Sequence, residues 1–437
     1  SFIYIFLMLF VCFRAFQYLR DIPRRHVAAA FWGSVCFVIL AEKLVEQEHF
    51  HFAVYYVAIL FLAAYTGLIY LYKKRRRELA AFLALALVAV EAAVNTTVTS
   101  VTTTSREAYT RDNKEVQALM EKLEPAEDFY RVEKKTRKTK NDGAWMNFPS
   151  VSLFSSTANA DLTKFFKRMG CEASTNAYSI TGSTPLVDSL LSVRYALYSE
   201  YIPNTDLVNY IQESGGTYLY ENLYTLPLGF VLPYDLADNW QYQMENPAEV
   251  QNDLCLLLGT DDVLVPVETE VSGSGCTFTA DMAGEYYVYI QNKKVKNVKA
   301  SLPSGEKNFS NVDRGYLLEM GNLSEGSRIT LTPGESGETL TAAVYRFSPR
   351  AMIQVYDRLS QSPLHLDSWR DTKLTGTVTA AESGTLFLSI PYDEGWTITI
   401  DGQPAEGEKI LEAFLSVPVE AGTHEISLIY MPGGLIP

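Results

Sequence analysis

The stretch LAAFLALALVAVEAAVNTTV, residues 79–98, decides the class of this protein. It matches the ~20 residues that cross ~30 Å of hydrocarbon as a helix. Three further apolar runs precede it, at residues 2–19, 27–44 and 52–72. A secretory signal peptide does not fit, because it has a single shorter apolar stretch behind a basic start. We therefore expect a membrane segment of four transmembrane helices in residues 1–98.

The charges between the apolar runs predict the orientation of these helices. The first loop carries Arg20, Arg24 and Arg25, and the third has five consecutive basic residues at 73–77. The second loop has three glutamates against one lysine. Lysine and arginine are retained on the cytoplasmic side of a membrane, which places the first and third loops there. Residues 99–437 are then predicted to be extracytoplasmic, outside a multi-pass cell-membrane segment.

Composition excludes several function classes. Residues 1–98 contain 10 lysines and arginines against 6 acids, which leaves 27 against 45 for the remainder of this chain of net charge -14. So acidic a polar part argues against nucleic-acid binding. The five cysteines place an odd three in the polar part, so a disulfide framework is not expected. The polar part has two histidines, His365 and His424, and no CxxC or HExxH motif. Its sequence therefore predicts neither a zinc site nor another bound cofactor.

The polar part is predicted to contain several domains. Residues 99–127 suggest a stem, formed by a Thr/Ser-rich stretch and a polar helix. Residues 128–262 show a mixed α/β pattern. Short alternating runs between turn residues predict β-sandwich-like units at 263–347 and 375–437, joined by a helical linker at 348–374.

An internal repeat relates the two β regions. TADMAGEYYVYI at 279–290 resembles TAAESGTLFLSI at 379–390, with an offset of 100 residues. GNLSEGSRITL at 321–331 resembles VPVEAGTHEISL at 417–428, with an offset of 96 residues. The order and spacing of these segments predict a duplicated unit.

Polar residues within the fourth apolar run are candidates for function. Glu91 and Asn95 are spaced i, i+4 and therefore share one helix face. An ionisable group at membrane depth is a functional candidate by default. The alternative, given equal weight, is that Glu91 lies in a wet cavity near the outer end of the helix and does no chemistry.

Two clusters in the polar part are less specific. Five basic residues between 134 and 140 would suit anionic lipid headgroups or a phosphate-rich polymer, although a solvated loop is the more common outcome. Nine tyrosines lie between residues 195 and 242. Tyrosine suits sugar recognition as well as it suits a core or an interface, so its abundance does not decide between them.

Several segments, taken in order, resemble the YfhO family of bacterial polytopic membrane proteins. They are Glu91 with Asn95, FYRV at 129–132, LFSS at 153–156, GSTPLVDSLL at 182–191 with VRY at 193–195, YEN at 220–222 with LPLGF at 226–230, and IPYDEGW at 390–396 with Asp401-Gly402. The family is related to membrane glycosyltransferases of the GT-C type. These take a sugar from a polyprenyl-phosphate donor outside the membrane and pass it to an envelope polymer such as lipoteichoic acid.

The resemblance implies supporting roles for seven residues. Glu91 and Asn95 are expected at the outer mouth of a membrane cavity, and five others on the acceptor side: Asp188, Arg194, Tyr195, Glu221 and Asn222. The alternative for these residues is fold maintenance, such as an Arg194–Asp188 pair. In GT-C enzymes an acidic residue on an early outer loop usually acts as the base. That loop would precede Ser1, so the base is expected upstream of this chain.

The implied partners are the lipid bilayer, a lipid-linked sugar and an envelope glycopolymer. A competing function is a non-catalytic, membrane-anchored protein of the envelope that binds carbohydrate or organises other proteins. A transporter is less favoured, because four helices with one intramembrane acid offer few groups for a transport path.

Overall fold

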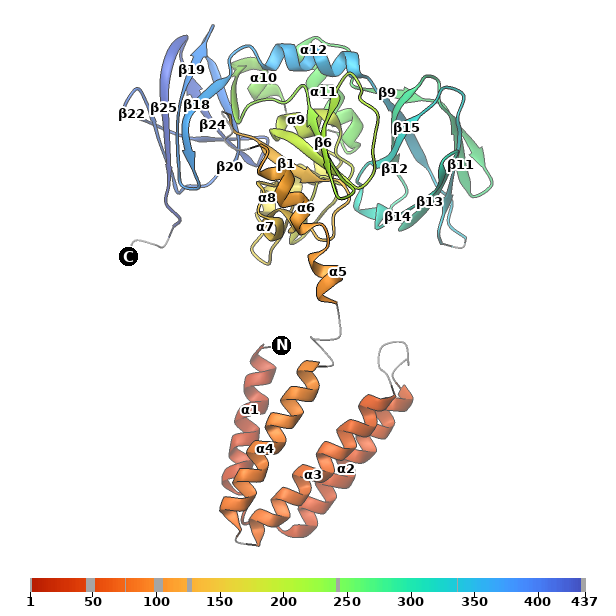
Figure 1. Ribbon diagram of the computed structural model, residues 1–437, viewed down its shortest axis with the longest axis vertical. Helices are drawn as coiled ribbons and strands as arrows, with labels where there is room; N and C mark the ends of the chain where they lie inside the picture. Colours follow the sequence, from red (N-terminus) through yellow and green to blue (C-terminus); the bar gives the residue numbers. More distant parts are fainter. Residues whose placement is uncertain are drawn as a thin grey trace. The chain divides into compact units, whose positions relative to one another are not determined.

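The computed structural model describes residues 2–44, 52–74, 76–97, 105–123, 128–240, 244–335 and 337–433. The chain forms two compact units, Ser1–Arg111 and Asp112–Pro437, which we call the helical unit and the β-rich unit (Figure 1). Most of the second membrane loop and most of the Thr/Ser-rich stretch of the expected stem lie outside the described residues.

The helical unit contains four apolar helices and one short polar helix. They are α1 (Phe2–Gln17), α2 (Arg24–Leu44), α3 (Ala53–Lys73), α4 (Arg77–Thr96) and α5 (Arg106–Thr110). By length and composition, α2, α3 and α4 are each able to cross a membrane, whereas the apolar helix α1 is shorter, at 16 residues. Their large apolar side chains are mostly exposed, as expected for surfaces that lipid covers.

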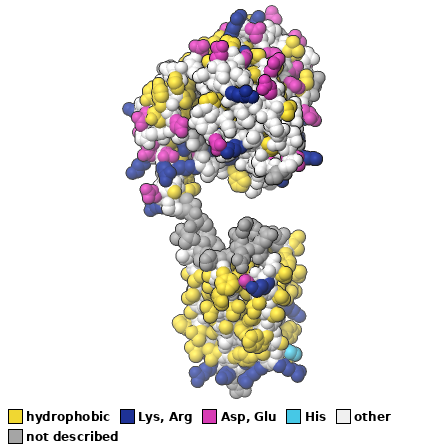
Figure 2. Space-filling view, turned by 90° about the vertical axis from the view of Figure 1, so that its right-hand side faces the viewer, with side chains coloured by type: hydrophobic (Ala, Val, Ile, Leu, Met, Phe, Trp, Pro, Cys, Tyr) yellow, Lys and Arg dark blue, Asp and Glu magenta, His cyan; other side chains and the backbone are white. Residues whose placement is uncertain are grey.

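The two basic loops of the helical unit lie at one end of it. Lys73 Nζ donates hydrogen bonds of 2.8 Å to the backbone oxygens of Leu19 and Arg20, which connects the end of α3 to the loop after α1. Figure 2 shows Lys and Arg side chains gathered at this end of a largely apolar surface. Both loops therefore lie on the same side, as their charges predict.

The β-rich unit begins with a region of helices and small sheets, residues 113–258, which we call the middle region. Its elements are α6 (Asn113–Met120), β1 (Arg131–Lys134), α7 (Asp142–Met146), β2 (Leu153–Phe154), α8 (Ala160–Arg168), β3 (Ala173–Ser174), β4 (Ala177–Tyr178), α9 (Pro185–Leu190), β5 (Val193–Tyr198), β6 (Val208–Ser214), β7 (Thr217–Asn222), β8 (Gly229–Pro233), α10 (Tyr234–Asn239) and α11 (Pro247–Leu258). Strands β1-β5-β7-β6 form one sheet, in which β1 runs parallel to β5.

Local sequence explains how α9 is positioned against this sheet. Thr184 is its N-cap and accepts a hydrogen bond from the Val187 backbone N–H, and Pro185 occupies the first turn, where a missing N–H costs nothing. The helix is buried along its length and packs against β5.

The chain then forms two β units. The first β unit contains β9 (Leu264–Val267), β10 (Thr269–Ser272), β11 (Gly275–Thr279), β12 (Gly284–Ile290), β13 (Asn297–Leu302), β14 (Gly305–Ser310), β15 (Leu318–Leu323), β16 (Arg328–Pro333) and β17 (Ala342–Phe347). The second contains β18 (Leu364–Arg370), β19 (Lys373–Ala380), β20 (Gly384–Pro391), β21 (Trp396–Ile400), β22 (Gln403–Ala405), β23 (Glu408–Ile410), β24 (Phe414–Val419) and β25 (Gly422–Tyr430). Helix α12 (Pro349–Leu359) lies between them in the chain, and Figure 1 shows them on opposite sides of the middle region.

The two β units share a strand order. The sheet β10-β11-β16-β13-β14 matches β18-β19-β25-β21-β22 position by position, and β15-β12-β17 matches β24-β20-β8. The repeated segments 279–290 and 379–390 fall on the matched strands β12 and β20. Each unit has a buried apolar core with residues from both of its sheets. In the second unit the place of β17 is taken by β8 from the middle region, and the outermost strands of these sheets also differ, since β9 flanks β17 in the first unit and β23 flanks β24 in the second.

Candidate functional site

A pocket of about 310 Å³ lies in the β-rich unit, where the middle region meets the second β unit. Three of the candidate residues line it: Arg194, Glu221 and Asn222. They come from β5 and from the end of β7. The opposite wall comes from α12 and β18, and includes Tyr356 and His365. Neither residue is predicted to belong to the site from the sequence, because both lie more than a hundred positions away from the other three and in no recognisable motif.

An ion pair forms the polar side of the pocket. Arg194 Nε donates to Glu221 Oε1 at 2.9 Å, and the Arg194 guanidinium lies 5.5 Å from the centroid of the Tyr195 ring. Burial would lower the pKa of Arg194, but the bond to Glu221 outweighs it and the pKa is raised. Tyr195, which follows Arg194 on β5, is directly opposite Glu221 on β7, so the pairing of these strands brings Arg194 within one residue of its partner.

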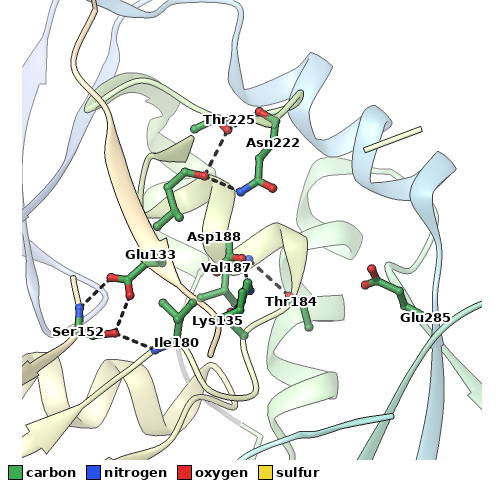
Figure 3. A network of polar contacts seen from close by, with 12 residues as sticks. Glu133, Lys135, Ser152, Ile180, Thr184, Val187, Asp188, Asn222, Thr225 and Glu285 are labelled. Carbon is green, nitrogen blue, oxygen red and sulfur yellow. Dashed lines mark hydrogen bonds and ion pairs between the residues drawn. The ribbon is translucent and has the colours of Figure 1, made fainter. Parts of the chain in front are cut away.

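Asn222 is held in place by the backbone. Its Nδ2 donates to the Val193 carbonyl at 2.7 Å, and the Thr225 hydroxyl approaches the same oxygen at 3.5 Å (Figure 3). The Asn222 side chain thereby fixes the path of the chain at the exit of β7. Tyr195 does not line the pocket; its ring packs edge-on against Tyr130 at 5.1 Å between centroids.

Asp188 lies apart from the pocket. It is 5 % exposed and forms an ion pair of 2.9 Å with Lys135 Nζ, whereas its Oδ1 has no hydrogen-bond partner among the described residues. The alternative pairing of Arg194 with Asp188 is therefore wrong, because each residue has a different partner. Figure 3 shows Lys135 and Asp188 in the middle region, with Glu285 reaching toward them from another element.

Glu285 and Glu319 of the first β unit lie close enough to this ion pair to interact with it electrostatically. Burial and the charge of Glu319 raise the pKa of Glu285 to about 7. Burial would lower the pKa of Lys135, but the charges of Asp188 and other acids raise it above its ordinary range. We call Lys135, Asp188, Glu285 and Glu319 the buried ionisable cluster. It connects the middle region to the first β unit.

The helical unit contains a separate polar contact. The Tyr65 hydroxyl on α3 donates a hydrogen bond to Glu91 Oε2 on α4. Asn95 lies one turn further along α4, and its side chain is exposed. The partner of Glu91 was not found from the sequence, because Tyr65 belongs to another apolar run and no spacing rule connects the two.

The basic cluster has acidic partners throughout. Lys134 and Lys138 approach Asp112, and Lys135 pairs with Asp188. Arg137, Lys140 and Arg314 surround Glu172, at 2.7, 3.1 and 3.4 Å. Each of these cations has an acidic partner, but three carboxylates serve six cations, so their positive charge is compensated only in part.

Residues 1–265 and 267–437 match a family model described as "Bacterial membrane protein YfhO". No curated protein matches the chain. Among solved structures, arabinofuranosyltransferase AftD from Mycobacteria has 10 % identity and a TM-score of 0.16, over 33 % of this chain and 12 % of its own. A glycoside hydrolase family 29 member from a rumen bacterium has 10 % identity and a TM-score of 0.18, over 43 % and 42 %.

Proposed function

Because this chain belongs to the YfhO family of bacterial membrane proteins, we propose that it serves in membrane glycosyl transfer. In this function a sugar moves from a polyprenyl-phosphate donor to an extracytoplasmic envelope polymer such as lipoteichoic acid. The family was recognised from the sequence, and the family match supports that recognition across nearly the whole chain.

The division into two units suits this reaction. A lipid-linked donor needs an apolar environment, which α2, α3 and α4 supply, with α1 proposed as a fourth span. A polymer acceptor needs a large polar surface, which the β-rich unit supplies. The donor is already activated, so no nucleotide-binding loop is required. The observation that carries the proposal is the pocket with Arg194, Glu221 and Asn222, since it gathers residues of the family-like segments at one place.

The proposed roles of the residues follow from their positions. Glu91, held by Tyr65, and Asn95 line the outer mouth of a membrane cavity, and the pocket residues bind the acceptor side. Asp188 and Tyr195 position the middle region beside the pocket.

The test compares the envelope polymers of three hosts: wild type, one with the gene deleted, and the deleted host with the longest reading frame containing this chain restored. NMR and mass spectrometry measure the glycosyl content of lipoteichoic acid and wall polymers. Loss and recovery of one decoration are expected. Unchanged polymers would contradict the proposal and favour a second candidate, a non-catalytic carbohydrate-binding or scaffold protein, which the duplicated β units would also suit.

The proposed orientation has its own test. A single cysteine is placed at Glu270, whose side chain is 78 % exposed, in a chain whose native cysteines are replaced. A membrane-impermeant maleimide is expected to label it in intact cells, and not to label a cysteine placed at Lys74 between α3 and α4. Labelling of Lys74→Cys with protection of Glu270→Cys would reverse the orientation.

A further inference from the structure

We infer that the pocket beside Arg194 and Glu221 binds an uncharged sugar residue of the acceptor, and that it excludes phosphate groups. The inference deepens the proposed function and rests on it for the class of ligand. It concerns which part of a glycopolymer the β-rich unit recognises.

The charge of the pocket disfavours an anion. Asp128 and Glu221 supply two carboxylates, and Arg194 supplies one guanidinium, whose Nε is already engaged by Glu221. With the imidazole of His365 neutral, the lining has one excess negative charge. A phosphate diester placed there would face two like charges, which costs binding free energy. The lining is therefore unsuited to the backbone of a polyphosphate polymer.

The polar groups that remain suit hydroxyl groups. Within the part of the chain that the structure describes, no hydrogen bond engages the second carboxylate oxygen of Glu221, the carboxylate of Asp128 or the His365 ring. Carboxylates accept hydrogen bonds, and a neutral imidazole both donates and accepts. Such groups match the hydroxyls of a pyranose ring, each of which donates and accepts.

The apolar lining and the size agree with a single sugar residue. Tyr356 presents a half-buried ring, held edge-on by Tyr224 at 5.4 Å, and Leu366 and Pro227 add apolar surface. A tyrosine ring offers an apolar face for the C–H side of a pyranose together with a hydroxyl. Ligand pockets are typically ~300–1,000 Å³, so about 310 Å³ accommodates a small ligand.

The walls are fixed before any ligand binds. The Asn222–Val193 hydrogen bond holds the exit of β7, and the next strand, β8, is paired with β20 of the second β unit. A pocket whose polar groups are already in place loses less conformational entropy on binding. This rigidity favours recognition of one residue in a chain of similar ones.

The test is saturation-transfer difference NMR on the full chain in nanodiscs. The probes are the methyl glycosides of glucose, galactose and N-acetylglucosamine, with glycerol 3-phosphate as the charged comparison. We expect transfer to at least one glycoside and none to glycerol 3-phosphate. Glu221→Ala is expected to weaken glycoside binding at least tenfold, and His365→Ala, at an exposed strand position, about threefold. Arg328→Ala removes an exposed cation of the first β unit outside the pocket and is expected to leave binding unchanged.

Several results would overturn the inference. They are binding of glycerol 3-phosphate in preference to the glycosides, absence of glycoside binding to the wild-type chain, and glycoside binding that both pocket variants retain. His365→Ala decides the matter if Glu221→Ala fails to fold. If the glycosides do not bind but the polymer decoration still depends on the gene, this inference alone is rejected and the proposed function stands. Glycoside binding with unchanged polymers would reject the transferase and leave a sugar-binding site.

Discussion

The two β units have the same strand order but are attached to the middle region in different ways. In the first unit, β12 pairs with β17 of the same unit. In the second, the equivalent strand β20 pairs with β8, which lies about 150 residues earlier in the chain. One unit is therefore complete by itself, whereas the other is completed by its neighbour. We call the contacts of the middle region with the first and second β units the first and second junctions. The pocket lies at the second junction, where the backbone hydrogen bonds between β8 and β20 connect the middle region to the second β unit.

Side chains reinforce the difference. Arg131 is half-buried and donates to the backbone oxygen of Leu191 at 2.6 Å and to the oxygens of Ser389 at 2.8 and 3.0 Å, which connects β1 to β20. Burial lowers its pKa to about 10, so it keeps its charge at neutral pH. The first β unit shares apolar core residues such as Tyr287, Leu317 and Phe347 with the middle region, and the buried ionisable cluster lies at this junction as well. We expect the second junction to be the more stable of the two, and the stability of the first junction to depend on pH.

The largest expected effect comes from the shared core of the second junction. Phe230 of β8 is fully buried and packs on Phe387 of β20 at 5.1 Å between ring centroids. Phe230→Ala should destabilise the protein by ~3–5 kcal/mol, because it removes buried apolar surface and leaves a cavity. Hydrogen–deuterium exchange should increase in the middle region and in the second β unit together.

Phe278→Ala is the matched control for that experiment. Phe278 is equally buried, but it lies in the core of the first β unit. Its loss should increase exchange in the first unit and spare the second. If Phe230→Ala affected the middle region alone, the two parts would not unfold as one.

The first junction should weaken as pH rises. The pKa of Glu285 is about 7 in the folded protein against an ordinary 4.5. The folded state therefore holds a proton that the unfolded state has lost, and stability falls between these values by up to ~3 kcal/mol. The groups facing Glu285 are Glu319, Lys135, Asp188 and Tyr287. Exchange in the first β unit is measured at pH 5 and pH 8 and corrected for the intrinsic rise of amide exchange with pH; the opening free energy so obtained should be lower at pH 8.

Glu285→Gln should remove most of this pH dependence, since the amide does not titrate. Glu306→Gln provides the comparison, because Glu306 on β14 is exposed and pairs with Lys299 on the neighbouring strand β13. Equal pH dependence in both variants would show that the buried ionisable cluster does not control the first junction.

Arg131→Ala should have a smaller effect, of ~2 kcal/mol, because it removes charge-assisted hydrogen bonds and leaves the Ser389 and Leu191 oxygens unpaired. Chemical denaturation measures the change. Arg346→Ala removes a more exposed ion pair with Asp281 in the first unit and should cost less. The reverse order of the two variants would contradict the importance of the β1–β20 connection.

The smallest effect concerns His424 on β25. Its bond to Asp401 Oδ2, at 2.8 Å, raises the pKa of His424 above its ordinary 6.5. This stabilising contribution is complete below pH 6.5 and is lost as pH rises through the folded pKa. In Asp401→Asn, NMR titration should show the His424 pKa moving back toward 6.5. An unchanged pKa would mean that the ion pair does not form in solution.

Some of this organisation could be predicted from local patterns. The apolar runs predicted helices, three of which are long enough to span a membrane, and the repeated segments fall on matched strands. The position of β8 beside β20, where the first unit has β17 beside β12, was not predictable. The pattern of residues in a strand does not tell which distant strand completes its sheet. The same limit hid the pocket, since Arg194 and His365 meet only through folding. It also hid the partners of the basic cluster, such as Glu172 and Asp112.

The most direct test of the account is transfer of a labelled sugar in a reconstituted membrane. The longest reading frame containing this chain is placed in proteoliposomes with polyprenyl-phosphate-linked [¹⁴C]hexose and purified lipoteichoic acid. The account predicts that radiolabel passes from the lipid to the polymer, and that Glu221→Ala slows this transfer while Arg328→Ala does not. Label that remains on the lipid, with the polymer bound to the protein, would contradict transfer and identify a binding protein.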